Sequence, residues 1–193
     1  YEDKPVLPGF ADKVGEVEAI IIQDAKRKLT VKRNGNNWVM ADRQNYVASN
    51  EVVSDVMLGL SELRLREAKT KKAKLYSRLQ VEDLKIKNAK SILLTIKGKT
   101  AELARLIVGK ASADVVGSSN AGRYIRKPSE AQSWLASGRL DIPLGVNKWV
   151  KPEFLDITSS RVENVTVIHP DGSKMVVSRA GKKKFEIRNN NLS

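Results

Sequence analysis

The 193-residue sequence contains no cysteine, a single histidine and few aromatic side chains, which make up 5% of the chain. The absence of cysteine excludes disulfides and thiolate metal sites. Because only carboxylates then remain as strong metal ligands, we predict no transition-metal site and no cofactor. No apolar run approaches the length of about 18 residues that a membrane helix needs. We therefore expect the protein to act through contacts on its surface rather than through a bound metal ion or cofactor.

Acidic residues are scarce relative to basic ones, with 22 Asp and Glu against 35 Lys and Arg and a formal net charge of +13. Such an excess favours contact with nucleic acid, anionic lipid or acidic polymer. The excess positive charge is concentrated between Glu62 and Lys90, where there are ten basic residues and four acidic ones, a local net charge of +6. The candidate contact residues for an anionic surface are Lys69, Lys71, Lys72 and Lys74.

Nucleic-acid modules generally add stacking aromatics to their basic residues. Tyr76 is the only ring near the four lysines. A solvated linker or a loop that faces anionic lipid therefore explains these charges as well as nucleic acid does.

The first regular elements are strands. Residues 19–23 and 28–33 are β-rich runs, and Asn34-Gly35 is the preferred pair for a two-residue hairpin turn. A third strand at 38–41 is predicted to pair back on the second. Ser49 is a typical helix N-cap, and the apolar residues after it recur at helical spacing: Val52, Val53, Val56, Met57, Leu60 and Leu63.

The end of the chain repeats its beginning. "VENVTVIHPDGSKMVVSR" at 162–179 follows the pattern of "VEAIIIQDAKRKLTVKR" at 17–33. Ile20 aligns with Val165, and Ile22 with Val167. The alignment continues through Leu29 with Met175, Val31 with Val177, Arg33 with Arg179 and Trp38 with Phe185. Self-similarity of this kind indicates a repeated architectural unit.

Between the two copies, residues 89–110 predict two strands joined by a turn at Gly98, and 123–127 predict another strand. "PSEAQSWLASG" is ambiguous, because Ser129 with Gln132 resembles a helix capping box, whereas Pro128 to Glu130 suits a hairpin turn. We favour the hairpin, with a strand at 132–136. One helical turn is expected near Trp149.

Together these patterns predict an α+β fold, in which repeated units of a β-meander plus a helix form antiparallel sheets and the helices cover one face.

Four motifs in a fixed order are similar to a bacterial domain-of-unknown-function family, numbered 4340. They are "LPGFADKVGEVEAIII", "LTVKRNGNNWVMADRQNYVASNEVVSDVMLGLSEL", "GRYIRKPSEAQSWLASGRLDIP" and "WVKPEFLDITSSRVENVTVIHPDGS". The resemblance covers nearly the whole chain from about Pro5 onward, and the ordered succession is more specific than any one motif. It implies an N-terminal membrane helix, a longer extracytoplasmic region and genes beside an ABC transport system of the gliding-motility type. It implies no catalytic residues.

On this basis the chain is expected to have four parts. Residues 1–16 are a lead-in after a removed membrane anchor, because the sequence begins with Tyr1 rather than Met. Residues 17–88 are a first meander and helix with a basic linker, residues 89–160 are a second β-rich unit, and residues 161–193 are the start of a third unit, truncated.

Patterns that imitate catalytic sites are weak. His169 lies in "HPDG", a tight-turn sequence with no legible nucleophile. "GKT" at 98–100 lacks the upstream glycine of a phosphate-binding loop. The carboxylate pairs Glu82 with Asp83 and Asp55 with Glu62 stand in charged contexts that would not raise a pKa. We therefore predict that the protein is not an enzyme.

The predicted function is that of a non-enzymatic, membrane-anchored extracytoplasmic protein, an auxiliary or scaffold component of an ABC-type transport system. Its partners would be components of the transporter or other membrane proteins, with an anionic lipid surface as a further contact. Its location would be the periplasmic face of the bacterial inner membrane, anchored by an N-terminal helix that this sequence lacks. The alternatives are a nucleic-acid or anionic-polymer binding protein, which the +13 charge suggests, and an envelope-polymer hydrolase built on a carboxylate pair.

Overall fold

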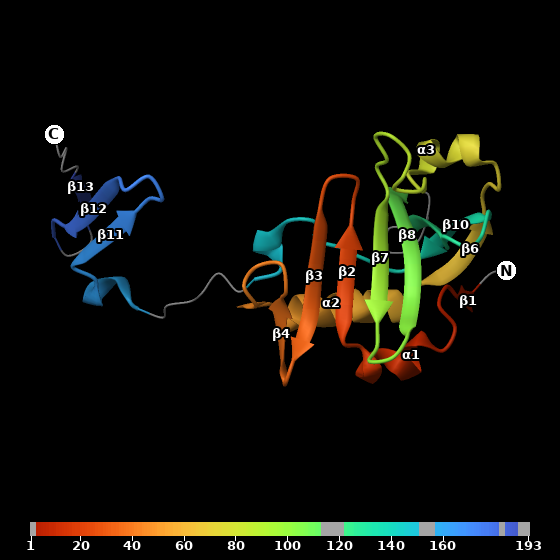
Figure 1. Cartoon of the computed structure of the whole chain (residues 1–193), viewed down its shortest axis with the longest axis horizontal. Helices are drawn as coiled ribbons and strands as arrows, with labels where there is room; N and C mark the ends of the chain where they lie inside the picture. Colours follow the sequence, from red (N-terminus) through yellow and green to blue (C-terminus); the bar gives the residue numbers. More distant parts are fainter. Residues whose placement is uncertain (1–2, 113–121, 151–156, 182–183, 189–193) are drawn as a thin grey trace. The chain divides into compact units, whose positions relative to one another are not determined.

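The computed structural model describes residues 3–112, 122–150, 157–181 and 184–188. The chain forms two compact units, Tyr1–Lys151 and Pro152–Ser193. The first unit contains a ten-stranded antiparallel sheet and the second a three-stranded one (Figure 1). The expected units at 17–88 and 89–160 therefore contribute strands to one continuous sheet.

The strands of the first unit are β1 (Lys4–Pro5), β2 (Ala19–Gln23), β3 (Lys28–Asn34), β4 (Asn37–Met40), β5 (Tyr46–Val47), β6 (Arg64–Ala68), β7 (Ile92–Lys97), β8 (Glu102–Ser112), β9 (Gly122–Arg126) and β10 (Ser133–Ser137). Their order across the sheet is β1-β6-β10-β9-β8-β7-β2-β3-β4-β5. The helical segments are α1 (Phe10–Lys13), η1 (Val14–Glu16), α2 (Asn50–Glu62), η2 (Ala73–Leu75), α3 (Tyr76–Leu79) and η3 (Val146–Lys148).

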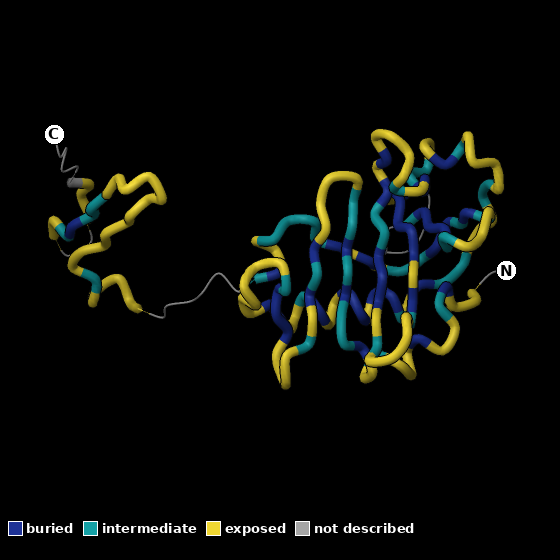
Figure 2. Tube along the Cα trace, in the orientation of Figure 1, coloured by how far each residue is buried: buried dark blue, intermediate teal, exposed yellow. Residues whose placement is uncertain are grey.

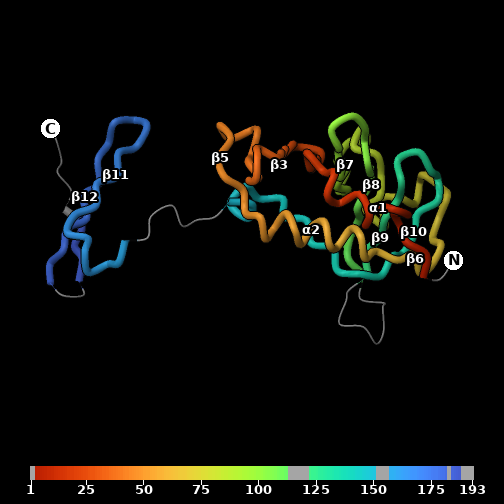
Figure 3. Tube along the Cα trace, turned by 90° about the horizontal axis from the view of Figure 1, so that it is seen from below, coloured from red at the N-terminus to blue at the C-terminus, as the bar shows by residue number. Residues whose placement is uncertain are grey.

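Helix α2 packs across one face of the ten-stranded sheet, behind β2, β3 and β7 in the view of Figure 1. Figure 3 shows the same helix from below, running from the β5 edge toward β6. The Ser49 hydroxyl caps it by accepting a hydrogen bond from the Val52 backbone N–H at 3.5 Å. The predicted helix and its cap are thus confirmed, and its apolar stripe forms the main core with alternate residues of the strands: Ile20, Ile22, Leu29, Val31, Met40, Leu94, Ile96, Leu106, Val108 and Ile125.

The first hairpin forms as expected, but its turn is displaced by one residue. Asn34 pairs with Asn37, so the loop is Gly35–Asn36 rather than Asn34–Gly35. Gly35 has a φ of 60°, while Asn34 stays extended within β3. Because the pairing partner of each strand residue decides the register, the turn forms where it keeps Val31 opposite Met40 on the core face.

The predicted fold class is wrong. The chain is mostly antiparallel sheet, and among the described residues α2 is the only α-helix longer than four residues. The opposite face of β7 to β10 is covered by the segment 69–91, which contains only η2 and α3 as short helical turns. This segment packs on the sheet through a second cluster of buried side chains: Tyr76, Val81, Ile107, Tyr124 and Leu135.

The second unit repeats the meander of the first in residue-level detail. Its strands are β11 (Asn164–Ile168), β12 (Lys174–Arg179) and β13 (Phe185–Arg188), preceded by η4 (Ser159–Arg161). Ile20 pairs with Val31, and their counterparts Val165 and Val177 pair in the same way. What repeats is therefore the three-stranded meander.

One arginine marks the same place in both copies. The Arg33 backbone N–H donates to Glu18 O at 2.8 Å, and the Arg179 N–H donates to Glu163 O at 2.8 Å. The two guanidiniums lie 4.9 Å from the ring centroid of Trp38 and 4.7 Å from that of Phe185.

The side-chain bonds of these arginines match as well. Nε of Arg33 donates to Val17 O at 3.2 Å, and Nε of Arg179 donates to Val162 O at 2.9 Å. The equivalence therefore includes side-chain chemistry as well as strand pairing.

Two local predictions in the middle of the chain are confirmed. The ambiguous stretch forms the β9–β10 hairpin, with Ser133 paired to Arg126 and Glu130 N–H donating to Lys127 O in the turn. The helical turn near Trp149 is η3, which ends at Lys148 and has Trp149 as its C-cap.

Candidate functional site

The four lysines singled out from the sequence follow β6 in the basic loop (residues 69–74), and the last of them, Lys74, is part of η2. Nζ of Lys69 lies 2.7 Å from Glu67 Oε2 and 5.9 Å from the centroid of the Tyr124 ring. Lys71, Lys72 and Lys74 are exposed. The structure thus separates Lys69, which is half-buried and paired, from three neighbours that are open to solvent contacts.

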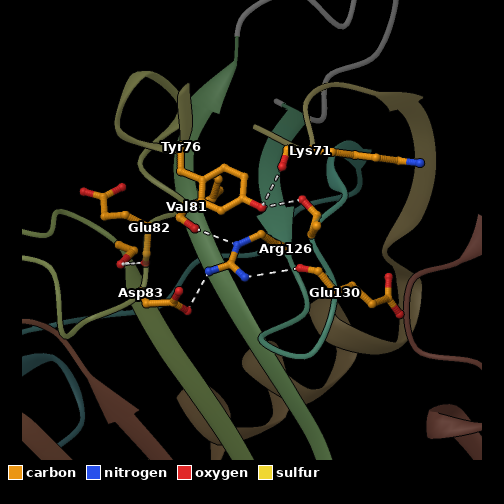
Figure 4. Close-up of polar contacts among 9 residues, drawn as sticks. Lys71, Tyr76, Val81, Glu82, Asp83, Arg126 and Glu130 are labelled. Carbon is orange, nitrogen blue, oxygen red and sulfur yellow. Dashed lines mark hydrogen bonds and ion pairs between the residues drawn. The ribbon is translucent and has the colours of Figure 1, made fainter. Parts of the chain in front are cut away.

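This basic loop is held on the sheet by a buried arginine of β9. The Arg126 side chain is 4% exposed, and its guanidinium donates to Val81 O at 3.0 Å and to Glu130 O at 3.2 Å. It also donates to Asp83 Oδ1 at 2.7 Å, a carboxylate whose side chain is 55% exposed. Figure 4 shows the guanidinium reaching all three acceptors from one position. Arg126 therefore ties the covering segment to the strand beneath it.

The ring of Tyr76 packs against the Arg126 guanidinium of the same cluster. The Arg126 guanidinium lies 4.5 Å from the centroid of its ring, a distance suited to a cation–π contact. The Tyr76 hydroxyl donates to Ala131 O at 2.5 Å, and the Lys71 carbonyl accepts a longer bond from it at 3.5 Å. The Lys71 side chain points away from the cluster (Figure 4). The network thus holds the backbone of the basic loop, while the side chains of Lys71, Lys72 and Lys74 remain exposed.

Glu82 is the second buried ionisable group of this region. Its Oε1 accepts a hydrogen bond from Lys90 N–H at 2.7 Å, and its backbone carbonyl accepts one from the Ser91 hydroxyl at 2.6 Å. Its Oε2 is buried and accepts no hydrogen bond from the residues that the structure describes. The two carboxylates of the Glu82–Asp83 pair therefore bind different partners. Asp83 accepts a hydrogen bond from Arg126, whereas Glu82 accepts one from the Lys90 backbone in the next loop.

The Arg126 network was not predicted, and the only signal for it was local. In "RYIRK" the alternation of a strand places Tyr124 and Arg126 on the same face. Their burial could be known only once the covering segment was placed on them.

Arg126→Met is expected to lower the free energy of unfolding of the first unit by about 3 kcal/mol, because the buried Val81 carbonyl and the partly buried Glu130 carbonyl lose their donor and Tyr76 loses its cation. Urea unfolding followed by tryptophan fluorescence measures this, since Trp38, Trp134 and Trp149 all lie in that unit. Trypsin should also cleave the segment 69–91 faster.

Arg105→Met is the matched control, because Arg105 is an exposed arginine of the neighbouring strand β8. Its removal should change the unfolding free energy by less than about 0.5 kcal/mol. Equal destabilisation by the two changes would contradict the role given to Arg126.

The second candidate surface is one face of the three-stranded sheet. Pairing places Val165, Val177 and Ile187 side by side, with Val167 opposite Met175. Phe185 completes this apolar face, paired with Arg179. The other face is more polar and carries Asn164, Thr166 and Lys174, although Ile168 and Val176 also lie on it. The sheet is therefore amphipathic, with most of its apolar side chains on one side.

This apolar face is open to solvent, whereas its counterpart in the first unit is buried. Val165 is 44% exposed and Ile187 64%, while Ile20 and Met40 at the matching positions are fully buried. Figure 2 shows the three-stranded unit as mainly exposed and the central strands of the ten-stranded sheet as largely buried. Sequence alignment alone identified these residues, but it could not show that the second set is more exposed than the first.

A cavity lies beside the outer side of α2. Asp55 and Glu62 both line it, but they stand two turns apart, about 10 Å along the helix axis. The paired carboxylates of glycoside hydrolases lie about 5 to 9.5 Å apart. The full lining is Val52, Asp55, Leu58, Gly59, Glu62, Arg139, Asp141, Pro143 and Lys148.

A half-buried arginine supports the wall of this cavity. Arg123 donates to Leu140 O at 2.9 Å and to Gly109 O at 3.3 Å. Burial lowers the pKa of the Arg123 guanidinium, and the Asp141 carboxylate offsets part of that effect. The cavity lining therefore mixes three acidic residues, Asp55, Glu62 and Asp141, with the two cations Arg139 and Lys148.

The remaining sequence candidates lie in turns. His169 is exposed in the β11–β12 turn, where its N–H donates to Ser173 O at 2.8 Å. "GKT" forms the β7–β8 turn, with Gly98 N–H donating to Ala101 O at 2.9 Å. Within the described ranges, no group of three or more His, Cys, Asp or Glu side chains is placed to hold a metal ion. None of the described helices has the length and apolar character needed to span a bilayer.

Comparison with known proteins gives one match. A family model described as Domain of unknown function (DUF4340) matches residues 38–191, which is well over half of the chain. The match includes α2, the segment 69–91, β7 to β10 and the three-stranded sheet. No curated protein and no solved structure matches the chain.

Proposed function

The chain belongs to the DUF4340 family, and on that premise we propose that it is a non-enzymatic scaffold of the bacterial cell envelope, associated with an ABC-type transport system. It would stand on the periplasmic face of the inner membrane, held by an N-terminal helix. Its partners would be protein components of the transporter.

The observation that carries this proposal is the exposed apolar face of the three-stranded sheet. Six apolar side chains share it: Val165, Val167, Met175, Val177, Phe185 and Ile187. Contiguous apolar surface on a folded unit marks a site of contact with another molecule. A sheet of three strands also gains much of its stability from whatever packs on its apolar side. The unit is therefore suited to binding a protein.

The basic loop suits the same location. Lys71, Lys72 and Lys74 project from a backbone that Arg126 and Tyr76 hold in place. A cluster of exposed lysines attracts an anionic leaflet, with about 1 kcal/mol per residue near the surface. The loop would therefore rest against lipid while the sheet face binds protein.

Co-purification tests the proposed function. The complete natural protein, tagged at its C-terminus and extracted in mild detergent, should retain the permease encoded beside it. Cell fractionation should place the protein with the inner membrane. A protein recovered in the soluble cytosolic fraction without the permease would refute the proposal.

The alternative reading has its own measurement. A nucleic-acid binder should bind a labelled oligonucleotide at low salt and lose affinity steeply as salt is added. We expect no such binding, because the exposed lysines are not accompanied by exposed stacking rings: Tyr76 and Tyr124 are both buried.

A further inference from the structure

The first unit shows what covers the apolar face of this meander. Ile20, Val31 and Met40 lie in one core cluster with Val53, Val56 and Leu60 of helix α2. The second unit carries the same strand pairings and the same arginine beside an aromatic ring. We propose that the exposed face of its sheet binds an acidic amphipathic α-helix of a partner protein, in the way that the first meander binds α2.

The acidic character of the ligand follows from α2 itself. Between Asn50 and Glu62 this helix carries Glu51, Asp55 and Glu62 and no lysine or arginine. In a chain with a net charge of +13, the element that covers the meander is thus one of its most acidic segments. A helix that meets the second meander should have the same apolar stripe and the same sign of charge.

The charge of the second unit is complementary to such a helix. Residues 157–188 contain seven Lys and Arg against three Asp and Glu, a net charge of +4. Arg179 lies on the apolar face itself, beside Phe185. Basic groups at the border of an apolar surface speed association with an acidic partner and select against basic helices. A basic amphipathic helix would therefore be the wrong ligand.

The geometry favours a helix over another sheet. In the first unit the six matching positions on three strands are buried in the core cluster that also contains the apolar stripe of α2, with exposures from 0% at Ile20 to 7% at Trp38. The side chains of the second unit are of similar type at each of these positions, with Phe185 for Trp38 and Ile187 for Met40. A sheet face with the same pattern of apolar side chains as the face under α2 should accept a helix with the same apolar stripe as α2.

This inference deepens the proposed scaffold function and rests on it for the identity of the ligand as a protein. The probe is a fluorescein-labelled peptide of residues 49–63, "SNEVVSDVMLGLSEL", titrated with the whole chain. We expect a saturable rise in fluorescence anisotropy. Because an isolated 15-residue helix is marginal in water, the peptide should also gain helical circular dichroism on binding.

Two substitutions form a matched pair. Ile187 is 64% exposed on the apolar face, and Ile168 is 63% exposed on the opposite face. Ile187→Asp should weaken peptide binding by more than about tenfold, because it places a charge against the apolar stripe of the helix. Ile168→Asp should leave the affinity unchanged. Since both side chains are equally open, the two variants should fold equally well, which circular dichroism of each variant checks.

A second peptide tests the charge. With Glu51, Asp55 and Glu62 all changed to lysine, the peptide keeps its apolar stripe but reverses its charge. It should bind at least about tenfold more weakly at low salt, and added salt should narrow the difference.

Other results would overturn the inference. If the chain dimerises and Ile187→Asp makes it monomeric, the face binds a second copy. If the chain binds vesicles of phosphatidylglycerol and phosphatidylcholine, Ile187→Asp abolishes that binding and the peptide does not bind, the apolar face binds lipid. Equal peptide binding by the two aspartate variants would show that the peptide binds elsewhere. The assay needs no transporter, so loss of permease co-purification with intact peptide binding would refute the proposed function alone.

Discussion

Trp149→Ala is expected to lower the free energy of unfolding of the first unit by about 4 kcal/mol, the upper range for removing a large buried side chain. Trp149 is the largest fully buried side chain of the described chain. Its indole N–H donates to Pro143 O at 2.7 Å, and its backbone carbonyl accepts from Ser49 N–H at 2.6 Å. The residue therefore joins the last loop of the unit to the start of α2.

Urea unfolding followed by circular dichroism measures this loss. Trp149→Phe keeps most of the packing but leaves the Pro143 carbonyl without its donor, so it should cost about 2 kcal/mol. Leu58→Ala is the control, because Leu58 of α2 is 56% exposed, and it should change the unfolding free energy by less than about 0.5 kcal/mol. A loss below 1 kcal/mol in Trp149→Ala would contradict the role given to the indole.

Gly109→Ala is expected to destabilise the first unit by about 3 kcal/mol, the upper end for overpacking a tight contact. A Cβ at Gly109 would lie 2.3 Å from Leu79 O and 2.8 Å from Val81 Cγ1. The nearest of these atoms is a backbone oxygen, so no side-chain rotation relieves the clash. The residue lies in the irregularity of the β8–β9 pairing, where the end of α3 approaches the sheet.

Urea unfolding followed by tryptophan fluorescence also measures this effect. Gly15→Ala is its control, since nothing lies within 4 Å of a Cβ at that position. The control should stay within about 0.5 kcal/mol of the unchanged protein. If Gly109→Ala is equally mild, the segment 69–91 must shift more easily than its contacts with β8 imply, and trypsin cleavage of that segment would show it.

The two changes act on opposite faces of one sheet. Trp149 belongs to the α2 side, and Gly109 contacts the segment that carries the exposed lysines. In Gly109→Ala the basic loop should therefore loosen before the main core does. Any contact of Lys71, Lys72 and Lys74 with an anionic surface would then be weakened without a change in those lysines.

The second meander illustrates the limit of pattern reasoning most clearly. Alignment paired Ile20 with Val165 and Trp38 with Phe185, and the hydrogen bonds of Arg33 and Arg179 show that the local structure is the same. Yet Trp38 is 7% exposed and Phe185 36%. Like residues in like strands differ because one meander lies under α2 and the other has no such cover among the described residues.

The sequence by itself determined the local elements of this protein: the capped helix α2, the hairpins, the His169 turn and the repeated meander. These follow from hydrophobic period and turn chemistry, which act over a few neighbouring residues. Only the tertiary structure decided that one sheet spans the first unit, that the segment 69–91 covers the face of β7 to β10 opposite α2, and that Arg126 is buried. Those outcomes depend on which distant segments pack against each strand face. Burial is therefore a property of two surfaces in contact rather than of either stretch of sequence alone.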